Sequence, residues 1–469
     1  MKIPTAGAKL VLALVLLGQA TPVAADSSRG FVFCTDYSTG TLDAVDVETR
    51  IVSRDLASVN ADALVRPYQG LLYVVNRLGV NGDNIQVIDP ARGYVTVRQF
   101  SVGPGSNPQD IAFVSPTKAY VSRYGSTDLV IVDPSSPSGG GPSFPTISLA
   151  GFSDSDGLPE MAHMTVFGGR LFVACERLTN FAAVNPSVVV VVDTQADTVI
   201  DVDPATQGVQ AIVLAGRNPW TSFELDPVGQ RLLIGDVGAF GALDGGIEAI
   251  DPVALTSLGF LITETGLEGD VVDVVWGDSR HSYALVSGAS DRLVAWDPTV
   301  GSVTATLLAS SGFSLVDMER NGRGELYVCK RTQPASGEPS GLLVFDAATD
   351  ALLAGPLDTG LPPAGIAFGS VIEAPGNSGA TLAEYPNPAR GAAVFRIEAS
   401  GAAVDRLEIY DALGRRVRNL SREASSAGPP EVPWNLKDDH GRPVAAGLYV
   451  AKARLQGRTL LRRLVVVRP

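Results

Sequence analysis

Residues Leu71–Pro90 read LLYVVNRLGVNGDNIQVIDP, and this stretch contains the pattern that decides the fold. An apolar strand is followed by a loop and by a second apolar strand that ends in aspartate. This strand–Asp pattern occurs seven times, at intervals of 43 to 60 residues: LDAVDV (Asp46), IQVIDP (Asp89), LVIVDP (Asp133), VVVVDT (Asp193), IEAIDP (Asp251), LVAWDP (Asp297) and LLVFDA (Asp346). Such periods, with several short strands per repeat, are typical of propeller blades. The sequence therefore predicts an all-β, seven-bladed β-propeller.

Each repeat contains four candidate strands in the same order. An inner strand such as QDIAFV (109–114) comes first, and a second strand such as LLYVVN (71–76) follows. The strand that ends in aspartate is third, and a Val/Thr-rich strand such as YVTVRQFSV (94–102) is fourth. We expect the aspartate to close the turn after the third strand by a bond from its side chain to the backbone.

The two ends of the repeat region predict how the ring closes. The region enters at Gly30 with GFVFCTDY, without an inner strand, and it ends with an unpartnered inner strand, PPAGIAFG (362–369). Pairing this last strand with the first repeat would complete that blade and protect its edge. The predicted propeller domain is 26–373.

The stretch LYVVN with the following NIQVIDP resembles the YVTN-type propeller repeat of exported bacterial and archaeal surface proteins. The resemblance covers Gly30 to about Gly369. It implies a seven-bladed propeller. Relatives include binding proteins, surface-layer components and a lactonase branch, so it leaves the activity open.

The first 25 residues have the pattern of a signal peptide. Lys2 and Lys9 precede or flank an apolar run, Leu10–Leu17, that is too short to cross a bilayer. Val23 and Ala25 form an A-x-A-like cleavage site, so we expect the mature chain to begin at Asp26. No later stretch is long and apolar enough for a membrane span. The protein is expected to be exported, without an integral membrane segment after cleavage.

A second domain is predicted at 382–469, after a small polar linker at 374–381. Five or so short strands separated by turn signals favour a small Ig-like β-sandwich. The motifs YPNP, IYDALGRRV, Trp434-x-x-x-Asp438-x-x-Gly441 and Gly447-x-Tyr449 resemble the C-terminal sorting domain of type IX secretion. They equally resemble the Ig-like domain of flagellar hook-capping proteins. The first resemblance implies contact with export machinery and a secreted or outer-surface protein, whereas a fixed accessory domain would leave the periplasm as an alternative.

The distribution of charge excludes nucleic acid as a partner. The chain has a formal net charge of −14, although residues 382–469 contain 15 basic and 9 acidic residues, so the propeller is strongly acidic. Binding to nucleic acid requires clustered basic groups that displace counterions.

Equivalent positions at the entry of the inner strands predict a polar ring at the channel mouth. Aligning the repeats on Asp110 gives, in chain order, Asp62, Asp110, His163, Ser222, Asp273, Asp317 and Gly365. Four carboxylates and an imidazole would then converge, and oxygen-rich sites suit Ca²⁺ or Mg²⁺. We therefore predict Asp62, Asp110, His163, Asp273 and Asp317 as candidate metal ligands. The alternative is that channel mouths of propellers are simply polar and wet.

Basic residues at the ends of the second strands form a second candidate set: Arg77, Arg123, Arg177, Lys330 and Arg331. Arginine can bind carboxylate or phosphate with two parallel hydrogen bonds, so these residues could hold a small anionic ligand on the same face. They could instead pair with nearby acids.

Two functions from different classes follow from these patterns. The first is a non-enzymatic exported binding or cell-surface protein that uses the top face of the propeller for a protein, a glycan or a small anion. The second is a metal-dependent lactonase or lyase at the channel mouth, through His163 and the aspartates. No G-x-S-x-G elbow, HExxH motif or phosphate-cradling loop is present in the sequence.

Overall fold

The computed structural model describes residues 29–139, 143–331 and 338–369, and then 381–398, 404–411, 415–421, 431–455 and 458–467. The predicted signal peptide and nearly all of the predicted linker lie outside these residues. The chain divides into two compact units, 1–372 and 373–469. Within the described ranges, no helix is long and apolar enough to cross a membrane.

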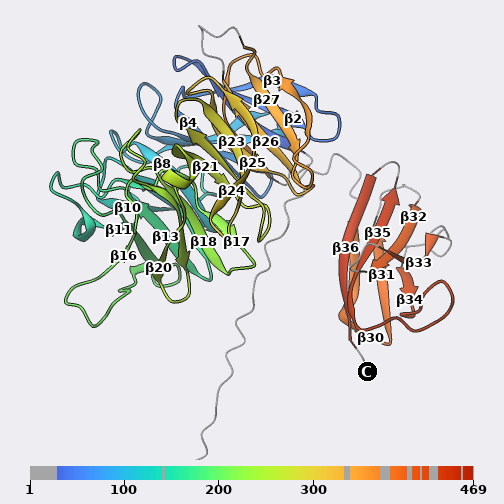
Figure 1. Cartoon of the computed structure of the whole chain (residues 1–469). Coiled ribbons are helices and arrows are strands. Elements are labelled where there is room, and N and C mark those ends of the chain that lie inside the picture. Colours follow the sequence, from blue (N-terminus) through green and yellow to red (C-terminus); the bar gives the residue numbers. More distant parts are fainter. Residues whose placement is uncertain are drawn as a thin grey trace, which may run out of the picture. The chain divides into compact units, whose positions relative to one another are not determined.

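The first unit consists of seven antiparallel sheets of four strands, which confirms the predicted propeller (Figure 1). Sheet one contains β29 (Pro363–Phe368), β1 (Arg29–Thr35), β2 (Gly40–Asp46) and β3 (Val52–Val59). Sheet two contains β4 (Ala63–Tyr68), β5 (Leu71–Asn76), β6 (Asn84–Asp89) and β7 (Val95–Ser101). Sheet three contains β8 (Pro108–Ser115), β9 (Lys118–Arg123), β10 (Asp128–Val132) and β11 (Thr146–Ser148). Sheet four contains β12 (Met161–Phe167), β13 (Arg170–Cys175), β14 (Val188–Asp193) and β15 (Thr198–Val199), and the short β16 (Ile212–Val213) also pairs with β14.

The remaining three sheets repeat the same order from inner to outer strand. Sheet five contains β17 (Glu224–Asp226), β18 (Arg231–Asp236), β19 (Gly246–Asp251) and β20 (Thr256–Thr263). Sheet six contains β21 (Asp270–Val275), β22 (Ser282–Ser287), β23 (Asp291–Asp297) and β24 (Ser302–Ser310). Sheet seven contains β25 (Leu315–Arg320), β26 (Glu325–Lys330), β27 (Gly341–Asp346) and β28 (Leu352–Leu357). In the described residues of the first unit, three short helices lie between strands: η1 (Pro90–Arg92), η2 (Ala150–Phe152) and α1 (Glu264–Leu267).

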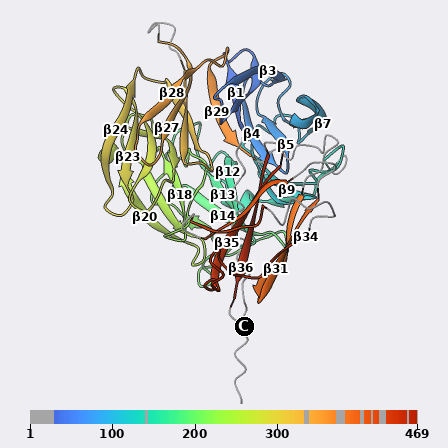
Figure 2. The ribbon, with the colours of Figure 1, turned by 90° about the vertical axis from the view of Figure 1, so that its right-hand side faces the viewer.

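The ring closes through its first sheet. Strand β29, from the end of the unit, pairs antiparallel with β1, from its beginning, with Gly30 opposite Phe368 and Phe31 opposite Ala367. The sheets follow one another around a ring, with β29 beside β1 (Figure 2). Pairing the two ends of the domain covers the inner edge of β1 and completes the first sheet.

The recurring aspartates close turns, as their position predicts. Each of the seven accepts a hydrogen bond on a carboxylate oxygen from the amide two residues later, over 2.7–3.1 Å. The side chain thus satisfies a backbone donor that the turn would otherwise leave without a partner. Their role is structural.

Seven apolar clusters lie between neighbouring sheets and hold the ring together. In one cluster Tyr120 and Leu129 of sheet three pack with Leu171 and Val190 of sheet four. The cluster at the closure joins sheets one and seven, and it contains Val32 and Val45 with Tyr327 and Val344. Each sheet therefore buries both faces, which explains why the second and third strands are almost continuously apolar.

The second unit is a small β-sandwich with an Ig-like fold. Its strands are β30 (Thr381–Arg390), β31 (Ala392–Glu398), β32 (Val404–Asp411), β33 (Arg416–Asn419), β34 (Glu431–Trp434), β35 (Gly447–Leu455) and β36 (Arg458–Val466). Strand β30 pairs with β31 on one side and, through Ala389, with β36 on the other. Trp434 lies fully buried in the core, edge-to-face with Tyr449, and its indole N–H donates to the Lys437 carbonyl over 2.9 Å.

Candidate functional site

A cavity of about 1150 Å³ occupies the mouth of the central channel. The inner strands of all seven sheets contribute to its wall, and loops that carry Tyr37, Leu78–Asn81, Trp220 and Arg331 form its rim. Most of the polar positions predicted from the repeat line this cavity, including His163, Ser222, Asp273 and Asp317.

Three of the predicted ring aspartates connect consecutive sheets. Asp110 accepts a hydrogen bond from the Met164 amide of the next sheet (3.0 Å). Asp273 accepts from the Met318 amide (2.8 Å), and Asp317 from the Ile366 amide (2.6 Å). A β-bulge at the entry of each of these inner strands turns the aspartate toward the next sheet. These carboxylates therefore stabilise the ring, whatever else they bind.

Asp62 does not occupy the equivalent position. Strand β4 pairs with β5 without a bulge. Val75 and Ser122 are each the second-last residue of the second strand in their sheets, and they lie opposite Leu64 and Asp110, respectively. Leu64 is therefore the residue equivalent to Asp110. The repeat alignment was therefore two residues out of register in sheet two. Asp62 lies nearer the rim, with its side chain 49% exposed and 3.5 Å from the Arg77 guanidinium.

A second level of charged residues lies two positions further along the inner strands: Arg66, Glu224 and Glu319. Arg66 donates to both carboxylate oxygens of Asp110, over 2.8 and 2.9 Å, and to the Ser222 hydroxyl over 3.1 Å. Sequence reasoning missed this level because it considered one position per repeat. The signal was the period of two along a strand, which puts residues i and i+2 on one face.

The charges of the cavity wall are unbalanced. Asp273, Asp317, Glu224 and Glu319 form no ion pair with a basic residue of the described part of the chain. Burial raises the pKa of Asp273 to about 7 and that of Glu319 to about 7, and it raises the pKa of Glu224 and Asp317 well above the usual range. The Glu319 charge adds to the rise in the other three pKa values.

The pKa of Asp110 is shifted in the opposite direction from those of the other four acids. Burial alone would raise its pKa, but the charge of Arg66 and the nearby His163 ring hold the pKa of Asp110 well below its usual value. Asp110 thus forms a two-bond ion pair with Arg66, which also donates to Ser222 and whose charge acts on Asp273, Asp317 and Glu319.

The neighbouring serine and histidine do not form a relay. His163 Nδ1 lies 3.6 Å from Asp110 Oδ2 and 3.4 Å from Ser222 Oγ, so both neighbours meet the same ring nitrogen. A Ser-His-Asp relay requires the serine and the carboxylate on opposite nitrogens. Burial lowers the pKa of His163, and Arg66 already donates to the Ser222 hydroxyl.

The five predicted basic residues lie on several loops and strand ends. Their side chains donate hydrogen bonds mainly to backbone carbonyls and to nearby acidic side chains. Arg123 donates to the Asp128 carbonyl and to the Val102 carbonyl. Arg177 donates to the Pro186 carbonyl over 2.8 Å.

The other three basic residues have partners too. Arg77 pairs with Asp62, and Lys330 pairs with Glu338 over 2.8 Å. Arg331 donates to the Thr35 carbonyl over 2.9 Å and stacks 4.5 Å above the Tyr37 ring. Of the five residues, Arg77 and Arg331 line the cavity.

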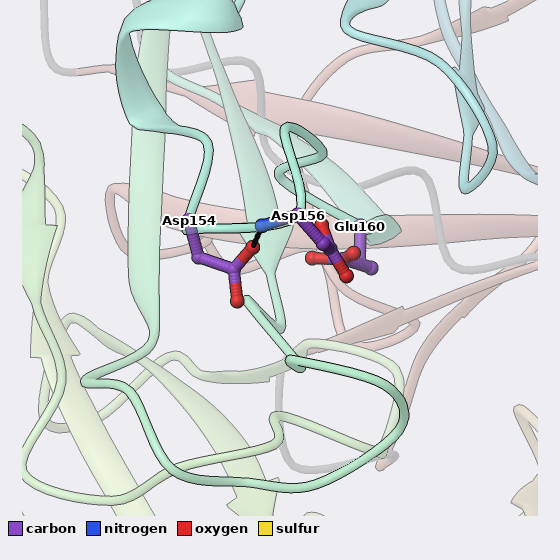
Figure 3. A group of neighbouring side chains, drawn as sticks. All are labelled: Asp154, Asp156 and Glu160. Carbon is purple, nitrogen blue, oxygen red and sulfur yellow. Dashed lines mark hydrogen bonds between the residues drawn. The ribbon is translucent and has the colours of Figure 1, made fainter.

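A separate acidic group lies in the loop before β12. Asp154, Asp156 and Glu160 each place a carboxylate oxygen within 4.8 Å of the others (Figure 3). Asp154 accepts hydrogen bonds from Thr179 and Asn185, and Glu160 accepts one from the Leu178 amide. Burial, with the charges of Asp156 and Asp154, raises the pKa of Glu160 to about 8. These bonds connect the loop before β12 to the loop that follows β13. In the sequence, the motif DSDG (154–157) was the signal for this acidic group.

Residues 386–457 match the family of FlgD Ig-like domains. The match covers the C-terminal unit alone, where the hook-capping resemblance was predicted. No curated protein matches the chain.

Solved structures match the propeller at low identity. A candidate 6-phosphogluconolactonase from Bacteroides fragilis is 13% identical, over 72% of this chain and 97% of that chain, with a TM-score of 0.52. A quinonprotein alcohol dehydrogenase-like protein from Bacteroides thetaiotaomicron is 16% identical, over 73% and 78%, with a TM-score of 0.48. A functionally unknown protein from Desulfotomaculum acetoxidans is 12% identical, over 73% and 99%, with a TM-score of 0.49. The likeness to the first of these three structures shows the propeller fold alone.

Proposed function

We propose that this chain is an exported binding protein whose propeller receives a small ligand at the mouth of its central channel and does not transform it. The observation that supports this function is the cavity of about 1150 Å³, whose wall contains several buried carboxylates from the inner strands. Concave sites in which a few polar groups converge are the usual places for small ligands.

The geometry favours binding over catalysis. The Ser222 hydroxyl has no relay through His163, as described above, and three ring aspartates accept amide hydrogen bonds from the next sheet. Among the described residues, the group of three acids close enough to share a metal is Asp154, Asp156 and Glu160, which does not line the channel cavity. A lactonase or lyase that uses the ring as a metal site is therefore the less favoured alternative.

Filling the channel tests the binding function. A Cβ at Gly365 would meet only Asp317 Oδ2 and Phe33 Cβ, each at 3.9 Å, and Gly365 lines the cavity, so we expect Gly365→Phe to place its ring there. We expect the variant to keep the Tm of the wild type within a few degrees. We also expect it to lose ligand-induced stabilisation, which for a ligand at 100 times its Kd is about 2.7 kcal/mol. The measurement is a thermal-shift panel of amines, sugars and sugar acids.

The matched control is Gly151→Phe, since Gly151 has open space around it and lies outside the channel cavity. It should respond to every compound as the wild type does. If no compound class stabilises the wild type, or if Gly365→Phe responds equally well, the binding function fails.

The C-terminal unit is proposed to direct the protein outward. The predicted signal peptide would bring the chain to the periplasm, and the Ig-like unit would act there as a sorting domain. Because 382–469 belongs to a separate compact unit, we expect its deletion to leave a folded propeller in the periplasm. Immunoblots of periplasm, cell surface and medium measure this. Unchanged secretion of the truncated protein would show that the unit is an accessory domain.

A further inference from the structure

A second cavity, of about 630 Å³, lies between sheets three and four, away from the channel. Residues of β11 and η2 line it together with residues of sheet four from Val188 to Val213. Strands β11, β15 and β16 are the outermost strands of their sheets, so the cavity lies at the outer rim of the propeller. It shares no lining residue with the channel cavity.

The cavity forms where the outer strand of sheet four is interrupted. Strand β15 pairs with the end of β14 and β16 with its beginning, and between them the chain leaves the sheet as a loop. The Val202 amide donates to the Gln210 carbonyl over 3.2 Å, and the Gln210 amide donates to the Asp201 carboxylate over 3.0 Å. These bonds close the loop at its base, so a well-formed loop borders the cavity.

Much of the cavity wall is apolar. Phe152, Val188 and Val199 belong to the apolar cluster between sheets three and four or pack against it. Val209 and Val213 also line the cavity, although 55% and 59% of their surfaces are exposed. An apolar group bound here would remove this surface from water, which is favourable. Pockets of about 300–1000 Å³ with apolar walls and few polar groups are typical of small-ligand sites.

Arg177 is the only charged residue among the described residues that line this cavity. Its Nη1 donates to the Pro186 carbonyl over 2.8 Å, whereas its Nε is enclosed and has no hydrogen-bond partner in the described part of the chain. The charge of Asp154 interacts with Arg177 without forming an ion pair, and that carboxylate already accepts hydrogen bonds from Thr179 and Asn185. A guanidinium has five donors, so Arg177 keeps donors from which an anion can accept.

We propose that this outer cavity is a second binding site, for a monocarboxylate with an apolar tail of the medium-chain fatty-acid type. The carboxylate would accept hydrogen bonds from Arg177, since arginine is the side chain best suited to a carboxylate. The tail would cover the exposed valines. The inference goes beyond the proposed function, because the site and the ligand differ from those of the channel.

Other classes of small ligand match only one half of this wall. A neutral apolar molecule would cover the Arg177 donors without giving them an acceptor, which costs free energy. A small inorganic anion would leave the two valines in water. An organic cation would meet the positive charge of Arg177 with no acid among the described lining residues to offset it.

Calorimetric titration of the full mature chain tests the ligand class. The probes are octanoate, hexanoate, acetate, 1-octanol and n-octylamine. We expect octanoate to bind about tenfold more tightly than hexanoate, because two more methylenes are buried. It should also bind about tenfold more tightly than 1-octanol, because only the carboxylate makes charge-assisted hydrogen bonds. Acetate and n-octylamine should not bind measurably.

Two variants locate the site. Arg177→Met removes the charge and keeps much of the stem, so it should weaken octanoate binding about tenfold and leave 1-octanol binding unchanged. Val209→Asp adds a negative charge at an exposed position of the wall and should also weaken octanoate binding about tenfold, by repulsion. Because Val209 is exposed on a loop, this second variant decides the question if Arg177→Met does not fold.

Three controls match these variants. Arg217→Met removes an arginine that also donates to a backbone carbonyl, over 3.1 Å, and Val228→Asp changes a valine that is 69% exposed. Neither residue lines the outer cavity. Gly365→Phe fills the channel instead. All three should bind octanoate as the wild type does.

The outcomes separate the two sites. Octanoate binding that is weakened in Arg177→Met and Val209→Asp and kept in the three controls would support the inference. An unchanged Kd in both variants, or 1-octanol binding as tightly as octanoate, would overturn it. Loss of octanoate binding in Gly365→Phe alone would place the anion in the channel, which overturns the inference and keeps the proposed function. Absence of octanoate binding at millimolar concentration would overturn the inference and leave the channel function untouched.

Discussion

Replacing Arg66 with methionine should destabilise the propeller by about 3 kcal/mol at pH 7, because it leaves a buried carboxylate without its charged partner. Asp110 is 1% exposed at its side chain, and Arg66 supplies two of its hydrogen bonds. Methionine keeps much of the apolar volume of the arginine stem, so the decrease in the free energy of unfolding measures the loss of the ion pair. Urea unfolding followed by tryptophan fluorescence at several pH values measures it.

The pH dependence gives this prediction a distinct signature. The pKa of Asp110 is lowered in the folded protein, so the ion pair contributes stability above the unfolded pKa of aspartate, about 3.9. That contribution is lost as the pH falls toward the folded pKa. The difference in the free energy of unfolding between the wild type and Arg66→Met should therefore become smaller below about pH 4. Equal stability of the wild type and of Arg66→Met at pH 7 would refute the argument.

Replacing Trp434 with alanine should cost about 4 kcal/mol and unfold the C-terminal unit. Trp434 is fully buried, contacts Phe395 and Tyr449, and donates to the Lys437 carbonyl. A small β-sandwich has little stability beyond that amount. Since the two units are separately compact, the propeller should remain folded.

Limited proteolysis distinguishes the two units, because the variant should lose its C-terminal fragment and keep a resistant propeller fragment. Trp434→Phe should cost less, since it keeps part of the apolar contact. Trp220→Ala is a control on a tryptophan that is 44% exposed, and both units should stay resistant. A C-terminal unit as resistant in Trp434→Ala as in the wild type would contradict the prediction.

Most of the propeller could be predicted because its repeat encodes a local bond. Each of the seven aspartates closes its own turn, so the pattern is visible within six residues. The pairing of 363–368 with β1 was also expected. The first repeat lacks an inner strand, and the sequence has one additional inner strand after the last repeat.

The candidate site was predicted less completely, for physical reasons. The alignment placed Asp110, Asp273 and Asp317 on equivalent positions, because the same bulge precedes each of them. It failed at Asp62, where no bulge occurs and Leu64 takes the position. A bulge depends on how two strands pair, and one strand's sequence does not reveal it.

The partners of the basic residues were also hidden from the sequence. Arg123 and Arg177 bind backbone carbonyls, and a carbonyl is present at every residue, so no residue type marks it. Arg66 was missed although it holds Asp110, because the two residues lie 44 positions apart on different sheets.

The pairing of β29 with β1 also constrains the order of events during synthesis. Strand β1 leaves the ribosome early, but its inner neighbour is made more than 300 residues later. Until then the first sheet has an open edge, and open edges recruit foreign strands. Contacts of such long sequence separation form slowly. The chain therefore remains dependent on protection from aggregation until its final inner strand arrives, immediately before the segment that leads to the C-terminal unit.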